Sequence, residues 1–176
     1  MLTIDISGMG GSYEDGCQLM LLRGLKYLKE HPDFDFSVYK SFRNVYGICE
    51  GEGDRAKELD EVICKGVEPS GAMHQAVISH LAYIHKNGHD AWIAEATKRD
   101  SSRVCEMPSE EELENKVLIS QIEWQLKLDG GFNPLAELFK NVPMEDVISV
   151  NPSDPESIKK AAEEIARRIK GLNKIH

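Results

Sequence analysis

The chain has 176 residues, 41% of them hydrophobic and 29% charged, which is the size and composition of one globular domain with a buried core. Its formal net charge of −9 is spread evenly, with −4 on residues 1–88 and −5 on residues 89–176, and repels nucleic acids and anionic membranes. No apolar run is longer than four residues, as at residues 19–22, and such a run is too short to span a membrane. Composition therefore disfavours nucleic-acid-binding and membrane-spanning proteins.

The cysteine pattern indicates a protein without a metal or redox centre. Cys17, Cys49, Cys64 and Cys105 form no CxxC pair, so buried free thiols are expected, and no metal or cofactor is identified. The first residues include Asp5 and lack the basic and apolar regions of a signal peptide, so the expected location is the cytoplasm. The 19 glutamates against 4 glutamines are a thermophile-like balance.

The N-terminal quarter is predicted to contain three strands and a helix. Residues 2–6 alternate and are rich in β-forming residues, which predicts a strand. Ser12 is a candidate N-cap for a helix that ends near residue 30 and is apolar around more than half of its circumference, so it should be deeply buried. The aromatic and β-branched segments 34–40 and 44–50 predict two further strands.

The middle of the chain is predicted to hold two helices and a hairpin. One helix is capped by Asp54 and ends at Gly66, and the next begins at Ser70 and ends at Gly88. Residues 89–95 and 103–107 predict two strands that could pair with each other.

A helix over residues 110–128 is predicted from the capping box of Ser109 and Glu112. This helix carries two apolar stripes, Leu113, Val117, Trp124 and Leu128 on one side and Leu118, Ile119, Ile122 and Leu126 on the other. A helix that is apolar on two sides must lie between two layers or be shared with a second subunit. A homodimer is therefore expected, through this helix or through a face that contains His74 and His85.

The last helix has the clearest pattern in the chain. Ser153, Pro155 and Glu156 provide an N-cap, a first-turn proline and a capping-box glutamate. One face is apolar throughout: Ile158, Ala161, Ala162, Ile165, Ala166, Ile169 and Leu172. Glu163–Arg167 and Glu164–Arg168 are spaced as i,i+4 ion pairs on the opposite face.

Together with a last strand at residues 147–150, these elements predict an α/β or α+β fold. We expect a single domain, residues 1–176, with a mixed sheet of about five to six strands covered by about six helices.

The glycine-rich loop after the first strand is a candidate anion site. Backbone amides freed by Gly8, Gly10 and Gly11, next to Ser12 at a helix start, could bind a phosphate. The countercharge would come from a cluster on the predicted hairpin: Lys98, Arg99 and Arg103. The spacing matches neither common phosphate-binding motif, and Glu14 and Asp15 oppose an anion at this helix start, so a plain tight turn is the competing interpretation.

Asp90, Glu95 and Lys98 resemble the acid, acid and lysine set of metal-dependent nucleases. The spacing is one residue longer than that motif requires, and alternation along a strand puts Asp90 and Glu95 on opposite faces. A nuclease-like site is therefore the weaker alternative. The histidines at 74, 80, 85 and 89 form no HExxH motif and are expected to lie in the core or at an interface.

Two phrases, DISGMGGSYEDGCQLMLLRGLKYLKEHP and GAMHQAVISHLAYIHKNGHDAWIAEATKRD, make most of the chain similar to a small family of archaeal proteins of unknown function. The resemblance implies no activity, cofactor or catalytic residue. The first phrase also resembles the opening strand, glycine turn and helix of nucleotide-sugar transferases, although the chain is too short for their two domains.

The chain contains no complete catalytic motif, so whether it is an enzyme stays open. The first hypothesis is a binding or assembly protein. The alternative is an enzyme or binder of a small anionic, nucleotide-like ligand that uses Gly8, Gly10, Gly11 and Ser12.

Overall fold

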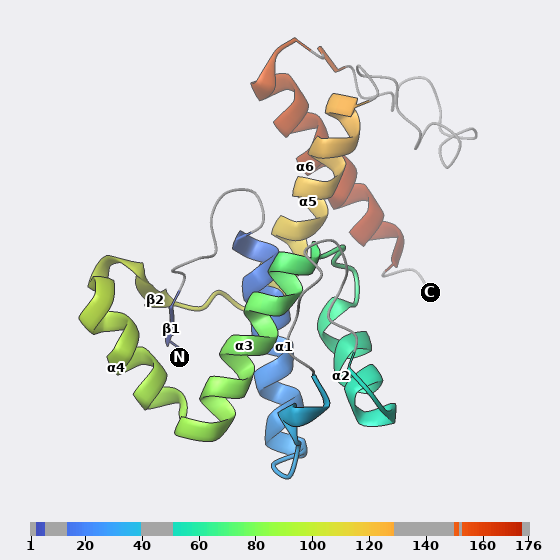
Figure 1. The fold of residues 1–176 in the computed structure, drawn as a ribbon. Coiled ribbons are helices and arrows are strands. Elements are labelled where there is room, and N and C mark those ends of the chain that lie inside the picture. The colour runs from blue at the N-terminus through green and yellow to red at the C-terminus, as the bar shows by residue number, and fades with distance from the viewer. Residues whose placement is uncertain (1–2, 6–13, 40–50, 129–149, 152, 174–176) are drawn as a thin grey trace. The chain divides into compact units, whose positions relative to one another are not determined.

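A computed structural model describes residues 3–5, 14–39, 51–128, 150–151 and 153–173 of the chain. The chain forms two compact units, Met1–Glu114 and Asn115–His176. The described residues are mainly helical, with six α-helices and two strands of three residues each (Figure 1). No helix among them is both long enough and apolar enough to cross a membrane. The predicted α/β or α+β fold with a mixed sheet of five to six strands is therefore wrong.

The sheet consists of two short strands of the first unit. β1 (Thr3–Asp5) pairs antiparallel with β2 (Val104–Glu106), with Ile4 opposite Cys105. The strands predicted at residues 2–6 and 103–107 are thus present at their centres. The second strand pairs with the N-terminal strand rather than with residues 89–95, so the predicted hairpin is wrong.

Two other segments predicted as strands are not strands in the structure. The Asp35 carboxylate accepts a hydrogen bond from the Ser37 amide at 2.9 Å, and this cap starts the short 3₁₀ helix η2 (Phe36–Val38). Residues 89–95 begin α4 (His89–Asp100), whose buried side chains Trp92 and Ala96 follow the four-residue spacing of a helix. Residues 44–50 and 147–149, where strands were also predicted, lie outside the described residues.

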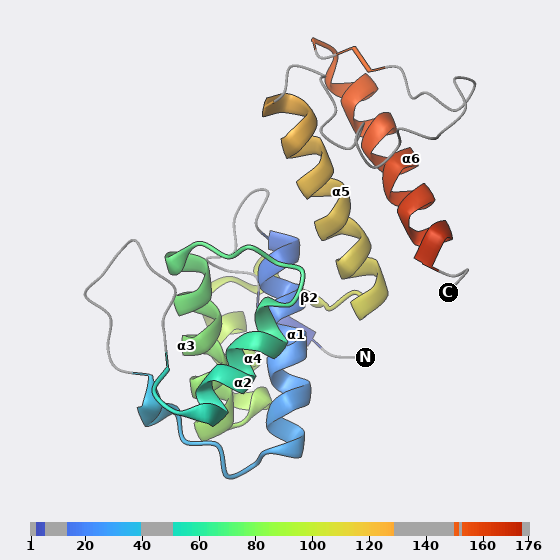
Figure 2. The same cartoon turned by 90° about the vertical axis from the view of Figure 1, so that its right-hand side faces the viewer.

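Three helices form the core of the first unit: α1 (Glu14–Glu30), α2 (Asp54–Cys64) and α3 (Gly71–Asn87). α1 packs against both α2 and α3, and more than half of its residues are buried, as predicted. A Cβ on Gly16 would lie 2.7 Å from Met73, and a Cβ on Gly24 would overlap Leu81. From the first contact to the second, the residue number rises by eight on both helices. α1 and α3 therefore run parallel and end at the same side of the unit (Figure 2).

Capping residues define several helix ends, as local chemistry predicts, although Gly53 rather than the predicted Asp54 is the N-cap of α2. The Ser70 hydroxyl accepts a hydrogen bond from the Met73 amide at 3.2 Å at the start of α3. Gly88, with φ +90°, ends α3 and also precedes α4. At the start of α5 (Glu110–Leu128), Ser109 and Glu112 bond to each other's backbone amides at 2.9 and 3.3 Å, so the predicted capping box is confirmed.

The second unit is built on one apolar face of α6 (Pro155–Asn173), which lies beside α5 (Figure 2). A single cluster joins the two helices: Ile122, Leu126, Ile158, Ala161, Ala162, Ile165 and Ala166. The predicted face of the last helix is thus confirmed for its five residues from Ile158 to Ala166.

The polar details of α6 differ from the prediction at two points. The Asp154 carboxylate, and not the predicted N-cap hydroxyl of Ser153, accepts a hydrogen bond from the Glu156 amide at 3.0 Å. Arg167 bonds to Glu164 at 2.7 and 2.8 Å rather than to Glu163, while the predicted Glu164–Arg168 pair is present at 2.8 Å.

Candidate functional site

The residues predicted to bind an anion are described only in part. Four of them lie outside the described residues: Gly8, Gly10, Gly11 and Ser12. Lys98 and Arg99 are exposed in the last turn of α4, and Arg103 ends the 3₁₀ helix η3 (Ser101–Arg103). Positive charge in the last turn of a helix is favourable without a ligand, because it complements the helix dipole. The anion site stays a prediction.

The acidic pair of the nuclease-like alternative lies on α4 rather than on a hairpin. Asp90 is in the first turn, and Glu95 follows five residues later. Five residues of an α-helix turn the chain so that the two side chains point about 140° apart. No group of three or more His, Cys, Asp or Glu side chains placed to hold a metal ion occurs among the described residues. The geometry gives this alternative no support.

His74 is a core histidine with a carboxylate partner. Its side chain is fully buried, and Nε2 lies 2.8 Å from Asp60 Oδ1, which also accepts a hydrogen bond from the Tyr39 hydroxyl at 2.9 Å. Nδ1 is buried and has no partner among the described residues. An imidazole without access to solvent cannot reach a substrate, so the pair links α2 to α3. His74 therefore has no surface to offer to the predicted dimer face, whereas His85 is half-buried.

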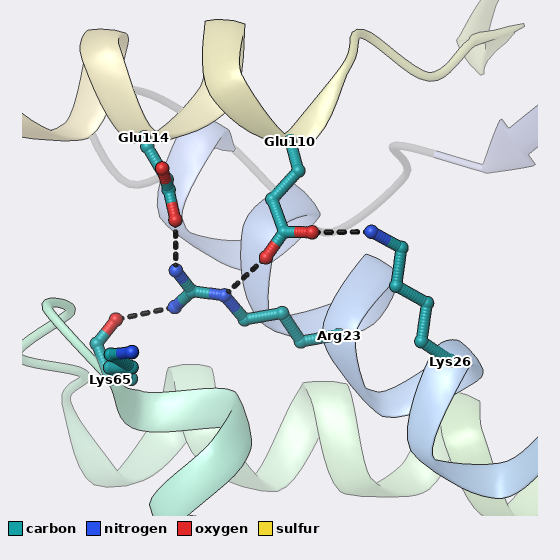
Figure 3. Close-up of polar contacts among 5 residues, drawn as sticks. All are labelled: Arg23, Lys26, Lys65, Glu110 and Glu114. Carbon is teal, nitrogen blue, oxygen red and sulfur yellow. Dashed lines mark hydrogen bonds and ion pairs between the residues drawn. The ribbon is translucent and has the colours of Figure 1, made fainter. Parts of the chain in front are cut away.

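A charged cluster around Arg23 connects α1 with Lys65, the residue after α2, and with the first residues of α5 (Figure 3). The guanidinium, 8% exposed, donates to Glu110 at 3.0 Å, to Glu114 at 2.7 Å and to the Lys65 carbonyl. Lys26 donates to the other Glu110 oxygen. The pKa of Glu110 is lowered by its hydrogen bonds to Lys26 and Arg23. Each charge here has a partner within the chain, so the cluster positions helices rather than a substrate.

An open cavity of about 480 Å³, here named the α1–α3 cavity, lies within the first unit. Its lining comes from α1, the last turn of α3 and the first residue of α4: Leu22, Leu25, Lys26, Leu28, Lys29, Ile84, His85 and His89. Most of its lining residues follow Gly24 on α1 or Leu81 on α3, two residues at which these helices lie in close contact. Its wall is aliphatic, and its polar groups are two lysines and two histidines.

Sequence reasoning missed this cavity, although a signal was present. Leu22, Leu25, Lys26 and Lys29 are spaced i, i+3, i+4 and i+7, so they share one face of α1. A helix face that mixes leucine with lysine and carries no acidic residue is unusual on a chain of net charge −9. The contribution of α3 and α4 could not be found this way, because it depends on how the helices pack.

The second feature that stands out is Trp124 on α5, 62% exposed. The other large exposed hydrophobic residues described, Val62 and Tyr83, are 36% and 37% exposed. Gln121 and Gln125, two of the four glutamines of the chain, lie beside Trp124 on the helix and are also exposed. We name these three residues the Trp124 surface; none of the three carries a charge.

Comparison with protein-family models, with curated proteins and with solved structures finds no match to this chain. The similarity to a family of archaeal proteins therefore stays a prediction.

Proposed function

We propose that this protein is a cytoplasmic, non-catalytic binding or assembly protein that forms a homodimer through the Trp124 surface. The exposed indole of Trp124 carries the proposal. Buried tryptophans contribute about 150–250 Å² of contact area, and covering the exposed 62% would stabilise a complex by roughly 2–4 kcal/mol per copy at about 25 cal/mol per Å².

The chemistry of the surface favours a second copy of the chain. Two copies with a net charge of −9 repel each other, so self-association requires a patch without charge. Gln121 and Gln125 meet this requirement, and the neighbouring charges of Glu123 and Lys127 pair with each other at 3.7 Å. Aromatic centres with few charges are typical of interface cores.

The test measures mass in solution over a concentration series by light scattering and sedimentation. The chain, 19.8 kDa, should approach twice this mass as concentration rises. Added salt should raise the dimer fraction, because it screens the repulsion between the two acidic copies. Trp124→Glu should give a monomer.

Tyr83→Glu is the matched control, because it adds the same charge at another exposed aromatic residue. This variant should keep the dimer. A mass of 19.8 kDa at every concentration, or equal loss of dimer in both variants, contradicts the proposal.

The anion-binding alternative with Lys98, Arg99 and Arg103 has no such observation in its favour. It predicts that a nucleotide or sugar phosphate raises the melting temperature and that Arg99→Ala abolishes the shift. A ligand at 100 times its Kd adds about 2.7 kcal/mol to the free energy of unfolding, so the absence of a shift would exclude tight binding.

A further inference from the structure

We propose that the α1–α3 cavity binds an unbranched fatty carboxylate. The cavity lies in Met1–Glu114 and the Trp124 surface in Asn115–His176, so this inference goes beyond the proposed dimer and does not depend on it.

The lining fits an aliphatic ligand body. Leu28 and Ile84 are buried, and Leu22 and Leu25 are half-buried, so the cavity has an apolar wall that solvent still reaches. These four residues are all aliphatic. The volume of about 480 Å³ lies within the range of about 300–1,000 Å³ typical of small-molecule sites. An alkyl chain is the ligand body that this wall can cover without leaving polar groups unsatisfied.

The charge around the cavity fits an anionic head group. The chain carries 30 acidic and 21 basic side chains, yet none of the eight lining residues is acidic and two are lysines. Lys26 already donates to Glu110, whereas no described residue forms an ion pair with Lys29. We therefore place the carboxylate at Lys29. Charge-assisted hydrogen bonds of this kind are stronger than neutral ones.

The dimensions favour a small molecule over a peptide. The α1 lining spans Leu22 to Lys29, about two helical turns, and α3 adds only two consecutive residues, Ile84 and His85. An amphipathic peptide helix needs anchors over several turns of a continuous groove.

The experiment is calorimetric titration of the full chain with dodecanoate below its micelle concentration. One molecule should bind per chain, and decanoate should bind more weakly by about fourfold for each CH₂ removed. Two ligands with the same alkyl chain, dodecanol and dodecyltrimethylammonium, test the head group. Both should bind at least about tenfold more weakly than dodecanoate, since they lack the charge-assisted bond.

Three variants locate the site. Lys29→Glu reverses an exposed charge at the cavity and should weaken dodecanoate binding about tenfold or more. Lys57→Glu makes the same change at an exposed lysine of α2 that does not line the cavity. This variant should bind dodecanoate as tightly as the unmodified chain does. Leu25→Trp fills the cavity and should abolish binding, with circular dichroism showing that the variant is folded.

The outcomes separate this inference from the proposed dimer. Trp124→Glu, even as a monomer, should bind dodecanoate like the unmodified chain. The inference is overturned by equal affinity for the three head groups, by equal loss in Lys29→Glu and Lys57→Glu, or by no saturable binding. Binding of an acidic amphipathic peptide without binding of dodecanoate would overturn it in favour of a protein partner.

Discussion

At the scale of single residues, burial makes two of the cysteine thiols poor nucleophiles. It raises the pKa of Cys17 and of Cys64 from 9.0 to about 11, and the nearby carboxylates of Glu14 and Asp60 add to the effect. The thiolate is the reactive form, and at pH 8 a thiol of this pKa is ionised in roughly one molecule in a thousand.

We therefore predict slow reaction of these thiols with Ellman's reagent at pH 8. In a Cys49→Ser, Cys105→Ser variant, two thiols per chain should react slowly in the native state and at once after denaturation. Reaction of either thiol at the rate of free cysteine in the native protein would contradict the expected protection.

The Arg23 cluster makes a residue-scale prediction about pH. The hydrogen bonds from Lys26 and Arg23 hold the pKa of Glu110 below its usual 4.5, so the folded state favours the ionised carboxylate. The resulting stabilisation is present above about pH 4.5 and is lost as the pH falls through the lower folded-state pKa. Glu110→Gln should destabilise the protein by about 1 kcal/mol at pH 7, a value reduced because Glu110 is 32% exposed.

Glu111→Gln is the matched control, because Glu111 lies in the same helical turn and has the same interaction with the helix dipole. In thermal unfolding from pH 7 to pH 3, the difference in melting temperature between the two variants should become smaller below pH 4.5. A gap that does not change with pH would show that the Glu110 charge is not responsible.

At the scale of elements, the close approach of α1 and α3 depends on Gly24. A Cβ at this position would overlap Leu81 in the core, and overpacking of this kind costs about 1–3 kcal/mol. Alanine gains about 1 kcal/mol over glycine from helix propensity, which offsets only part of that cost. We predict that Gly24→Ala destabilises the protein by up to about 2 kcal/mol in urea unfolding.

Gly171 provides the opposite case. It is exposed near the end of α6, and a Cβ there has no neighbour within 4 Å among the described residues. Gly171→Ala should stabilise the protein by up to about 1 kcal/mol, from propensity alone. Equal effects of the two substitutions would show that α1 and α3 can move apart at little cost.

The element scale also shows where patterns in the sequence succeed. Ser70, Gly88 and the Ser109–Glu112 box define helix ends with bonds that reach three or four residues, so they can be recognised locally. The strand predicted at residues 89–95 is wrong because β-forming residues do not make a strand without a partner strand. That segment instead buries Trp92 and Ala96 as one face of α4.

At the scale of the whole molecule, α5 runs without interruption across the boundary between the two units, Met1–Glu114 and Asn115–His176. Unfolding either unit must therefore unravel part of a helix that belongs to both. We predict a single cooperative transition, in line with the expectation of one domain over residues 1–176, with equal calorimetric and van't Hoff enthalpies.

The two tryptophans allow a direct check, because Trp92 lies in the first unit and Trp124 in the second. Fluorescence of Trp92→Phe and of Trp124→Phe follows one unit each, and the two urea midpoints should coincide once each variant's own stability is taken into account. Two separate transitions in the unmodified chain would divide it into two domains.

The caps at Ser70, Gly88 and the Ser109–Glu112 box, and the buried faces of α1 and α6, could be read from the sequence, since each depends on spacing or on bonds within a few residues. Only the tertiary structure decided that the fold is helical, that Trp124 is exposed while Leu126 is buried, and that Lys29 lies beside Ile84 and His85 at a cavity. These features depend on contacts between residues that are far apart in the chain. Hydrophobicity along a sequence shows that a side chain is more stable when buried, but the packing of the elements decides which hydrophobic side chains are buried.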